Sequence, residues 1–385
     1  MENMKVAVDA RGAFWFRGTG IGTYTYQLVK GLAESEDFEY LFFDPVSSPL
    51  SKQIKAANVQ WKSVIEHPSW QVEQVQMMHS MAAEGVDLYH MPQNGLNMPT
   101  ELSSCLPIVV TLHDVIPFIL PQTCNLAFRR RFLTQMSRIA DKSSGIITVS
   151  HHSKADIIRH LSVSPEKITV VYPAPEPIYV PLPKDACREF LREHYGLSGA
   201  PLVFYVGGFS MRKNVHLLLR AFAQGLRKLG PEARLVLVGR TTPEVAELKQ
   251  WAAWLGITQH VVYPGHIQVR HLPEFYGAAD VFVYPSLYEG FGLPPLEAMA
   301  CGIPTIVSCE AALPEVVGEG AWQIDPYNSA ELCAAILEVV LNDKTASKLS
   351  RQGQAWVRRY SWKKAVHETL MVYKRILSDG KRLCL

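Results

Sequence analysis

Two carboxylates stand out in the segment 284–304, which reads YPSLYEGFGLPPLEAMACGIP. Glu289 lies in a glycine-spaced loop, and Glu297, eight residues on, lies in the first turn of a predicted helix. A helix N-terminus presents free N–H groups that favour anions, and a carboxylate beside it accepts hydrogen bonds from hydroxyl groups. This combination suits a ligand with both phosphates and hydroxyls, such as a nucleotide sugar. In the alternative, Glu297 only complements the helix dipole and Glu289 is a solvated loop charge.

A pair of cations occupies a second loop. Arg212 and Lys213 lie between a predicted strand over 202–206 and a predicted helix over 215–229, where cations can meet a diphosphate. The sequence has no GxxxxGK[ST] loop, no GxGxxG after a strand and no GxSxG, which argues against P-loop, dinucleotide-binding and common hydrolase chemistry. It also has no HExxH, no DxD and no metal-spaced His/Cys set, so we expect no metal and no cofactor.

Further candidates lie in the first half of the chain. His113 follows a predicted strand over 108–112, and ligands of open α/β sheets collect beyond the carboxyl ends of strands. A structural histidine is the alternative. Gly20 and Gly22 lie in a predicted loop before a helix from about Thr23, where glycine allows close approach to a ligand. A tight turn without a ligand is the alternative there.

Composition sets the broad class of the protein. The 385 residues are 48% hydrophobic and 19% charged, enough for two domains with full cores. A net charge of +2 gives no support for nucleic-acid binding. The seven cysteines are scattered without CxxC, the N-terminus lacks a signal-peptide pattern, and no apolar run is long enough to span a membrane. We therefore expect a cytoplasmic protein that is at most peripheral at the inner face of the membrane.

Strands and helices alternate in two series, which predicts two doubly wound parallel-sheet domains with a ligand cleft between them. The segment 173–183, PAPEPIYVPLP, holds five prolines and is the predicted linker. We expect domains over 1–175 and 176–358, followed by a helical segment over 359–385. The other predicted strands are 5–9, 40–43, 86–90, 145–149, 168–172, 235–238, 261–263, 281–284, 305–308 and 322–324. The other predicted helices are 68–84, 125–142, 150–161, 244–255, 272–278, 329–341 and 362–377, with one more starting at Pro294.

The predicted helix over 125–142 carries a cluster of basic residues. Arg129, Arg130 and Arg131 are consecutive and lie between the apolar residues Phe128 and Phe132. The pattern is typical of an amphipathic surface helix with a solvated basic face. It also suits a docking surface for anionic lipid headgroups.

These motifs together resemble those of retaining glycosyltransferases of the GT-B fold, family 4, over essentially the whole chain. The strongest match is Glu289-x7-Glu297 within SLYEGFGLPPLEAMACGIP. Weaker matches follow the family's order along the chain: DAR…GTGIGTY, THDVIP, TVSxxSK, GGFSMRKN and the strand-end GH at 265–266. The sequences of these motifs resemble those of bacterial mannosyltransferases of polysaccharide or O-antigen assembly.

The resemblance implies a role for each candidate residue. Glu289 would contact hydroxyls of the donor sugar, Glu297 would bind the ribose hydroxyls, and Lys213 with Arg212 would hold the diphosphate. The same resemblance implies that Gly20 and Gly22 approach the phosphates and the acceptor, that His113 lies near C6 of the donor sugar, and that the backbone at His266 meets the base. Gly208 stands where some members carry arginine, so Arg212 would replace that arginine. The remaining implied donor-binding positions are Ser286, Gly290, Phe291, Gly292 and Leu293.

The resemblance also implies partners and a reaction. GDP-mannose is the expected donor, with UDP-glucose and related UDP-sugars as alternatives, and the acceptor would be a glycan or a lipid-linked saccharide. Transfer would retain the anomeric configuration through front-face attack, and the leaving phosphate oxygen would take the acceptor's proton. The C-terminal helix would cross back to the first domain. A nucleotide-sugar hydrolase or epimerase of the same fold, and a non-catalytic sugar- or nucleotide-binding module, are the rival interpretations.

Overall fold

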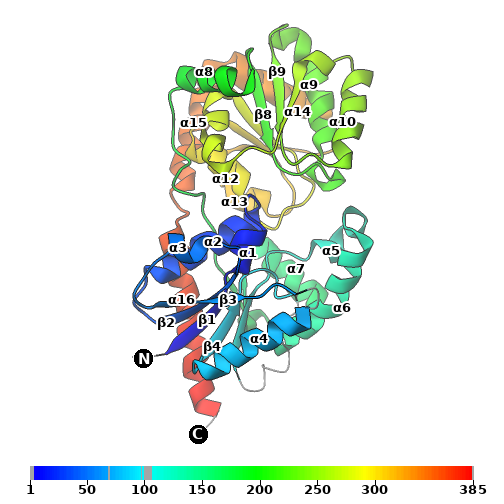
Figure 1. Ribbon diagram of the computed structural model, residues 1–385. Helices are drawn as coiled ribbons and strands as arrows, with labels where there is room; N and C mark the ends of the chain where they lie inside the picture. The colour runs from blue at the N-terminus through cyan, green and yellow to red at the C-terminus, as the bar shows by residue number, and fades with distance from the viewer. Residues whose placement is uncertain (1–3, 68–69, 97, 99–105, 384–385) are drawn as a thin grey trace. The chain divides into compact units, whose positions relative to one another are not determined.

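The computed structural model describes residues 4–67, 70–96, 98 and 106–383. The chain divides into two compact units (Figure 1). Unit 1 comprises residues 1–174 and 361–385, and unit 2 comprises residues 175–360. Unit 2 is therefore a continuous segment inserted between two parts of unit 1.

Unit 1 is built on a parallel sheet of seven strands in the order β3-β2-β1-β4-β5-β6-β7. The strand order reverses between β1 and β4, which makes this pair the topological switch point of the sheet. Strands such as IVVT at 108–111 are wholly buried, as expected for parallel strands covered on both faces. The strands are β1 (Lys5–Asp9), β2 (Glu39–Pro45), β3 (Val59–Val64), β4 (Leu88–Met91), β5 (Ile108–Thr111), β6 (Gly145–Thr148) and β7 (Ile168–Val170).

Side-chain caps explain where two helices of unit 1 begin. Asn125 accepts hydrogen bonds from the N–H groups of Ala127 and Phe128 at the start of α6, and Ser150 accepts from Ser153 at the start of α7. The helices of unit 1 are α1 (Arg11–Trp15), α2 (Gly20–Ala33), α3 (Leu50–Gln53), α4 (Trp70–Ala83), α5 (Ile116–Ile119), α6 (Leu126–Lys142), α7 (His151–Leu161) and α16 (Trp362–Leu383), with short 3-10 turns η2 (Pro121–Thr123) and η3 (Pro165–Lys167).

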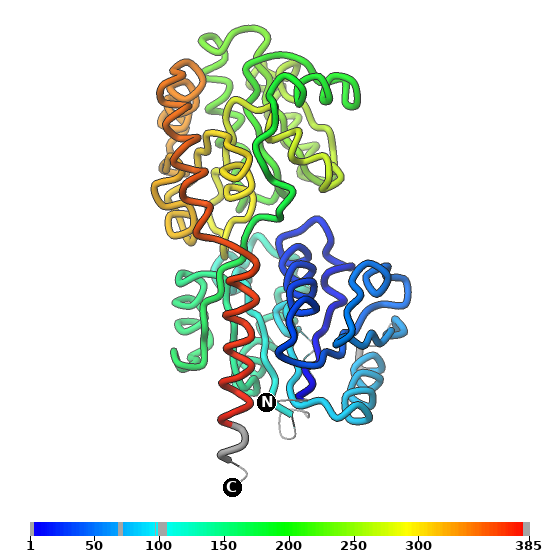
Figure 2. The backbone as a smooth tube through the Cα atoms, turned by 90° about the vertical axis from the view of Figure 1, so that its left-hand side faces the viewer, coloured from blue at the N-terminus to red at the C-terminus, as the bar shows by residue number. Residues whose placement is uncertain are grey.

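The last helix, α16, belongs to unit 1 (Figure 2). It packs so closely on α2 that a Cβ on Gly31 would lie 2.4 Å from the Val366 side chain. The hydroxyl of Tyr373 lies 2.6 Å from Nδ1 of the buried His90 on β4. Residues from the end of the chain therefore complete the core that the first strands begin.

Unit 2 is built on a six-stranded parallel sheet in the order β10-β9-β8-β11-β12-β13, and its switch point lies between β8 and β11. Figure 1 shows helices on both faces of this sheet. The strands are β8 (Leu202–Val206), β9 (Arg234–Val238), β10 (Val261–Gly265), β11 (Val281–Tyr284), β12 (Thr305–Ser308) and β13 (Trp322–Ile324). The helices are α8 (Lys184–Tyr195), α9 (Val215–Leu229), α10 (Pro243–Trp254), α11 (Leu272–Ala278), α12 (Leu293–Ala300), α13 (Leu313–Val317), α14 (Ser329–Leu341) and α15 (Asp343–Val357), with 3-10 turns η4 (Met211–Lys213), η5 (Thr258–His260), η6 (Val269–His271) and η7 (Gly318–Gly320).

The predicted fold class is confirmed, and some element boundaries differ. Helix α2 begins at Gly20 rather than near Thr23, because Thr19 caps it by accepting a hydrogen bond from the N–H of Gly22. Strand β3 and helices α1, α3, α5, α8 and α13 were not predicted from the sequence. The helix predicted over 68–84 is α4, and residues 68–69 of that prediction lie outside the described part of the chain. None of the helices in the described ranges combines the length and apolar character needed to cross a bilayer.

Candidate active site

The loops after β8 and β11 lie against each other at the switch point of unit 2. The backbone N–H of Leu287 donates to the carbonyl of Arg212 at 2.8 Å. The side-chain amide of Asn214 donates to the carbonyls of Pro285 at 3.1 Å and Pro326 at 2.7 Å. Asn214 has a left-handed backbone (φ 55°), which ends η4 and lets α9 begin at the next residue. These bonds hold the cationic loop beside the glycine-spaced loop.

The two predicted cations and the first predicted carboxylate form one cluster. Glu289 Oε2 lies 2.8 Å from Arg212 Nη1, and Glu289 Oε1 lies 2.7 Å from Lys213 Nζ. Lys213 also donates to the hydroxyl of Tyr284 at 2.7 Å, and Arg212 donates to the carbonyl of Tyr288. Glu289 is only 8% exposed. The alternative in which Glu289 is a solvated loop charge is therefore wrong.

The charge of this cluster favours an anionic ligand. Burial alone would raise the pKa of Glu289, but the charges of Arg212 and Lys213 outweigh burial and lower the pKa to about 2. The hydroxyl of Ser286, which is buried, contributes to this lowering of the pKa. Glu289 is thus ionised at neutral pH and balances one of two positive charges. The cluster keeps an excess of positive charge at the carboxyl ends of the strands, where ligands of open α/β sheets bind.

Glu297 lies at the fifth position of α12, so its predicted place in the first turn is wrong. The helix starts one residue before the two prolines because Gly292, with φ 113°, provides its N-cap. Leu293, another predicted donor-binding residue, is the first residue of this helix. A Cβ on Gly292 would also lie 2.7 Å from the Leu313 side chain, so both backbone conformation and packing require glycine there.

The carboxylate of Glu297 is buried among tyrosines rather than cations. The hydroxyl of Tyr276 donates to Glu297 Oε2 at 2.8 Å, and the hydroxyl of Tyr179 also bonds the carboxylate. Burial raises the pKa of Glu297 to about 7, the Tyr276 hydrogen bond opposes this, and nearby Glu176 adds to it. Glu297 therefore changes charge near neutral pH, and it can both accept and donate hydrogen bonds to vicinal hydroxyls such as those of a ribose.

The remaining donor-site candidates of unit 2 differ in exposure. Gly290 and Phe291 are buried, and the Phe291 ring meets the edge of Tyr360 with ring centres 5.9 Å apart. Gly208 is exposed, and a Cβ on it would meet nothing within 4 Å. His266 is also exposed and directly follows β10, which β9 separates from β8. The buried loop after β11 thus lies next to a more exposed stretch after β8.

In unit 1, His113 is fixed by its neighbours. Its backbone N–H donates to Asn94 Oδ1 at 2.8 Å, and its Nε2 lies 2.9 Å from the carbonyl oxygen of Pro92. A carbonyl oxygen only accepts, so Nε2 carries the proton and Nδ1 is the acceptor in the neutral ring. Burial lowers the pKa of His113 to about 4, so the ring is neutral at neutral pH. The ring also meets Tyr24 edge to face at 4.8 Å.

The structure changes the interpretation of the N-terminal glycines. Gly20 and Gly22 lie in the first turn of α2 and not in a loop. A Cβ on Gly22 would lie 2.0 Å from the carbonyl oxygen of Phe16, so the close packing of this turn already requires glycine. Gly20 is exposed.

Three tyrosine partners at the site, Tyr179, Tyr276 and Tyr284, were not predicted from the sequence. Tyr276 lies within the predicted helix over 272–278, and the sequence pattern there gives no sign that its hydroxyl bonds Glu297. Tyr284 ends β11 and bonds Lys213, and its position at a strand end was the one signal available. Within the described ranges, no group of three or more His, Cys, Asp or Glu residues could hold a metal ion.

The basic helix α6 has an exposed face that is both apolar and cationic. Leu126 is 78% exposed and Phe128 is 42% exposed at its N-terminal end. Arg130 and Arg131 on the same helix are also exposed, while Phe132 packs into the core. Docking of this helix on anionic lipid stays a prediction.

Comparison with known proteins identifies both halves of the chain. Residues 18–175 match the family model described as Glycosyltransferase Family 4, and residues 188–356 match the model described as glycosyl transferases group 1. The O-antigen chain mannosyltransferase B of Escherichia coli is 29% identical over 371 residues, which cover 92% of this chain and 96% of that protein. The O-antigen chain mannosyltransferase RfbU of Salmonella typhimurium is 29% identical over 230 residues, 60% of each chain.

Solved structures share the fold. The sucrose-phosphate synthase of Thermosynechococcus elongatus superposes with a TM-score of 0.78 at 20% identity, covering 98% of this chain and 100% of that one. The Anabaena protein HepE, solved in complex with UDP-glucose, superposes with a TM-score of 0.77 at 21% identity, covering 97% and 99% of the two chains. The chain therefore belongs to the glycosyltransferases of the GT-B fold, with a family 4 domain followed by a group 1 domain.

Proposed function

We propose that this enzyme transfers mannose from GDP-mannose to a glycan or lipid-linked saccharide, with retention of the anomeric configuration. The observation that carries the proposal is the cluster of the buried Glu289 with the partly buried Arg212 and Lys213 at the switch point of unit 2. It brings together two cations and one ionised carboxylate, a set of groups that supports the binding of a sugar diphosphate. The names of the relatives support mannose as the sugar.

Each part of the donor has a partner in this proposal. Arg212 and Lys213 hold the diphosphate, and Glu289 accepts hydrogen bonds from the sugar hydroxyls. Glu297 binds the ribose hydroxyls, and the backbone at His266 meets the base. The loop from Ser286 to Leu293 supports the donor, and Gly208 leaves open space beside the diphosphate.

Charge development explains how the cluster accelerates transfer. The bond between the anomeric carbon and the diphosphate oxygen breaks, and a bond from the same carbon to the acceptor oxygen forms on the same face. The acceptor's proton passes to the leaving phosphate oxygen. Arg212 and Lys213 stabilise the negative charge that builds on the diphosphate, so we propose that no divalent metal is needed. His113, Gly20 and Gly22 of unit 1 would serve the donor sugar and the acceptor.

The donor base is tested by a thermal-shift panel of GDP, UDP and ADP. A ligand at 100 times its dissociation constant adds about 2.7 kcal/mol to the free energy of unfolding. We expect GDP to raise the melting temperature, and Lys213→Ala to abolish that rise, while Lys228→Ala, at the far end of α9, leaves it unchanged. A shift with UDP and none with GDP would exclude GDP-mannose. UDP is the second candidate because HepE was solved with UDP-glucose.

The reaction type is tested by nucleotide release. A transferase releases GDP from GDP-mannose much faster when a saccharide acceptor is added, and EDTA has no effect if no metal is needed. Release at the same rate without an acceptor would favour the nucleotide-sugar hydrolase interpretation.

A further inference from the structure

We propose that the aromatic run Phe14–Trp15–Phe16 of unit 1 is the surface on which the saccharide acceptor stacks, with the Trp15 ring as the main contact for a pyranose. The inference rests on the proposed function only for the chemical class of the acceptor. Its evidence comes from residues that the donor site does not use.

The run lies at the switch point of the unit 1 sheet. Strand β1 ends at Asp9 and α1 begins at Arg11, between the two halves of the sheet. Ligands of open α/β sheets bind outside the carboxyl ends of the strands at this point. Phe14 and Trp15 are each 37% exposed and Phe16 is 41% exposed. Three consecutive large aromatic side chains are thus partly open at the place where the fold favours a ligand.

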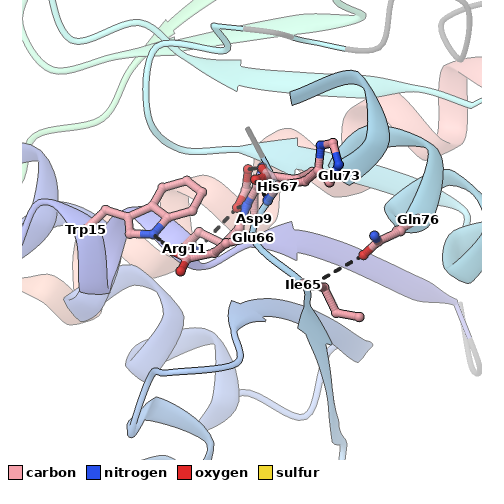
Figure 3. Close-up of polar contacts among 8 residues, drawn as sticks. All are labelled: Asp9, Arg11, Trp15, Ile65, Glu66, His67, Glu73 and Gln76. Atoms are coloured by element: carbon pink, nitrogen blue, oxygen red, sulfur yellow. Dashed lines mark hydrogen bonds and ion pairs between the residues drawn. The ribbon is translucent and has the colours of Figure 1, made fainter. Parts of the chain in front are cut away.

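The Trp15 ring is held in one orientation from two sides (Figure 3). Its indole N–H donates to Glu66 Oε1 at 2.8 Å. The guanidinium carbon of Arg11 lies 4.7 Å from the centre of the ring. A ring that is already fixed loses little side-chain freedom on binding, which favours its use as a contact surface.

Arg11 is itself locked in place and is not available to a phosphate. Its Nε and Nη2 each donate to Asp9 at 2.8 Å, and its Nη1 donates to Glu73 Oε2 at 2.7 Å. Burial alone would lower the pKa of Arg11, but Asp9 and Glu73 raise it above the ordinary value. The guanidinium is therefore a support beneath the Trp15 ring, neutralised by its own carboxylates.

The charges around the ring identify the kind of ligand. Asp9, Glu66 and Glu73 are three acids grouped with the single cation Arg11 (Figure 3). This excess of negative charge repels a lipid phosphate. It suits a neutral polyhydroxyl ligand, whose hydroxyls can donate to the exposed carboxylate of Glu66 while the apolar face of its ring packs on an aromatic side chain. A neutral saccharide is therefore the occupant that we propose.

The test measures acceptor binding without a donor. Mannotriose and maltotriose are titrated into wild type, Trp15→Ala and Trp15→Phe, and the dissociation constants are read by NMR. We expect at least one trisaccharide to bind, and Trp15→Ala to weaken it about tenfold, which corresponds to about 1.4 kcal/mol. Trp15→Phe, which keeps a ring but not the bond to Glu66, is expected to lie between the two. Trp254→Ala removes a tryptophan that is 73% exposed on α10 and is the matched control, with binding unchanged.

Three results would overturn the inference. In the first, the wild type binds neither trisaccharide. In the second, Trp15→Ala binds the trisaccharide as tightly as the wild type does. In the third, Trp15→Ala keeps trisaccharide binding and loses binding to phosphatidylglycerol vesicles. If Trp15→Ala does not fold, Trp15→Phe and Phe16→Ala decide the same question. The GDP-induced thermal shift is measured on the same variants and should not change, because the donor cluster lies in unit 2. If GDP does not raise the melting temperature of the wild type, the proposed donor is refuted, but the trisaccharide result still tests the acceptor surface.

Discussion

Replacing Glu289 by glutamine should separate stability, nucleotide binding and transfer. Glutamine keeps the size of the side chain and removes its charge, so the partly buried Arg212 and Lys213 lose the buried carboxylate that is their counter-ion. Breaking a buried ion pair from one side is strongly destabilising. Because the glutamine does not neutralise the two cations, both are available to bind a diphosphate. GDP should therefore bind at least as tightly to Glu289→Gln as to the wild type. Transfer should fall about a hundredfold or more, because the hydroxyls of the donor sugar lose their carboxylate.

The size of the stability effect follows from the pKa of Glu289. A carboxyl whose pKa falls from 4.5 to about 2 on folding stabilises the protein by about 3 kcal/mol at neutral pH. The folded-state pKa is lowered, so this contribution is complete above pH 4.5 and is lost as the pH falls toward 2. Glu289→Gln should therefore cost about 3 kcal/mol at pH 7 and about half as much at pH 3.

Scanning calorimetry measures the effect directly. For a unit of this size, about 3 kcal/mol corresponds to a fall of roughly 6 to 12 °C in melting temperature. Glu247→Gln is the control: this glutamate lies in the same unit and pairs with His216 at 3.3 Å, but its side chain is 57% exposed. Exposed pairs contribute about 1 kcal/mol or less, so the control should change little.

Two results would refute the reasoning about Glu289. One is a melting temperature for Glu289→Gln at pH 7 within about 2 °C of wild type. The other is a difference from wild type that is the same at pH 7 and pH 3, which would mean that the carboxylate charge does not supply the stability. If Glu289→Gln binds GDP more tightly and transfers sugar as fast as the wild type, the assignment of Glu289 to the sugar hydroxyls is wrong.

Two further predictions concern other positions. Burial raises the pKa of Glu297 to about 7, so ionisation costs stability as the pH rises from 4.5 through 7. Glu297→Gln should therefore melt higher than wild type at pH 8 and the same as wild type at pH 4, and a lower melting temperature at pH 8 would contradict this. Gly22→Ala forces a Cβ to within 2.0 Å of the Phe16 carbonyl and should lower the melting temperature by several degrees. Gly208→Ala meets nothing within 4 Å and should melt as wild type does; equal melting temperatures for the two alanine variants would show that the turn before α2 can move aside.

Much of the fold could be predicted because the strands are short apolar runs bounded by glycine, proline or charged residues. Strands β8, β11, β12 and β13 match their predicted bounds. Strand β3 was missed because its sequence, VQWKSV, is largely exposed and lacks the apolar run of a central strand. The order of the strands could not be predicted, since it depends on which crossovers skip a neighbour and not on local pattern.

The site was predicted as separate parts and not as an assembly. The sequence pointed to Arg212 and Lys213 as cations after one strand and to Glu289 as a carboxylate after another. That the three form one ion-pair cluster depends on β8 and β11 being neighbours, which only the sheet order reveals. The two tyrosines around Glu297 had no sequence signal: Tyr276 lies in a helix, where a tyrosine and a phenylalanine give the same periodicity, and Tyr179 lies in the segment predicted as the linker.

The contribution of α16 to unit 1 has a consequence for biosynthesis. A ribosome completes β1 to β7 before any of unit 2, but the surface that receives Val366 and Tyr373 stays uncovered until the final helix is made. Unit 2 is translated between these two events, and at 5–20 residues per second its translation takes roughly 10 to 40 s. During that interval the surface of α2 and β4 that α16 covers in the folded protein is exposed on the nascent unit 1. A nascent chain stalled before residue 361 should therefore be a strong chaperone client, and one that includes α16 should not.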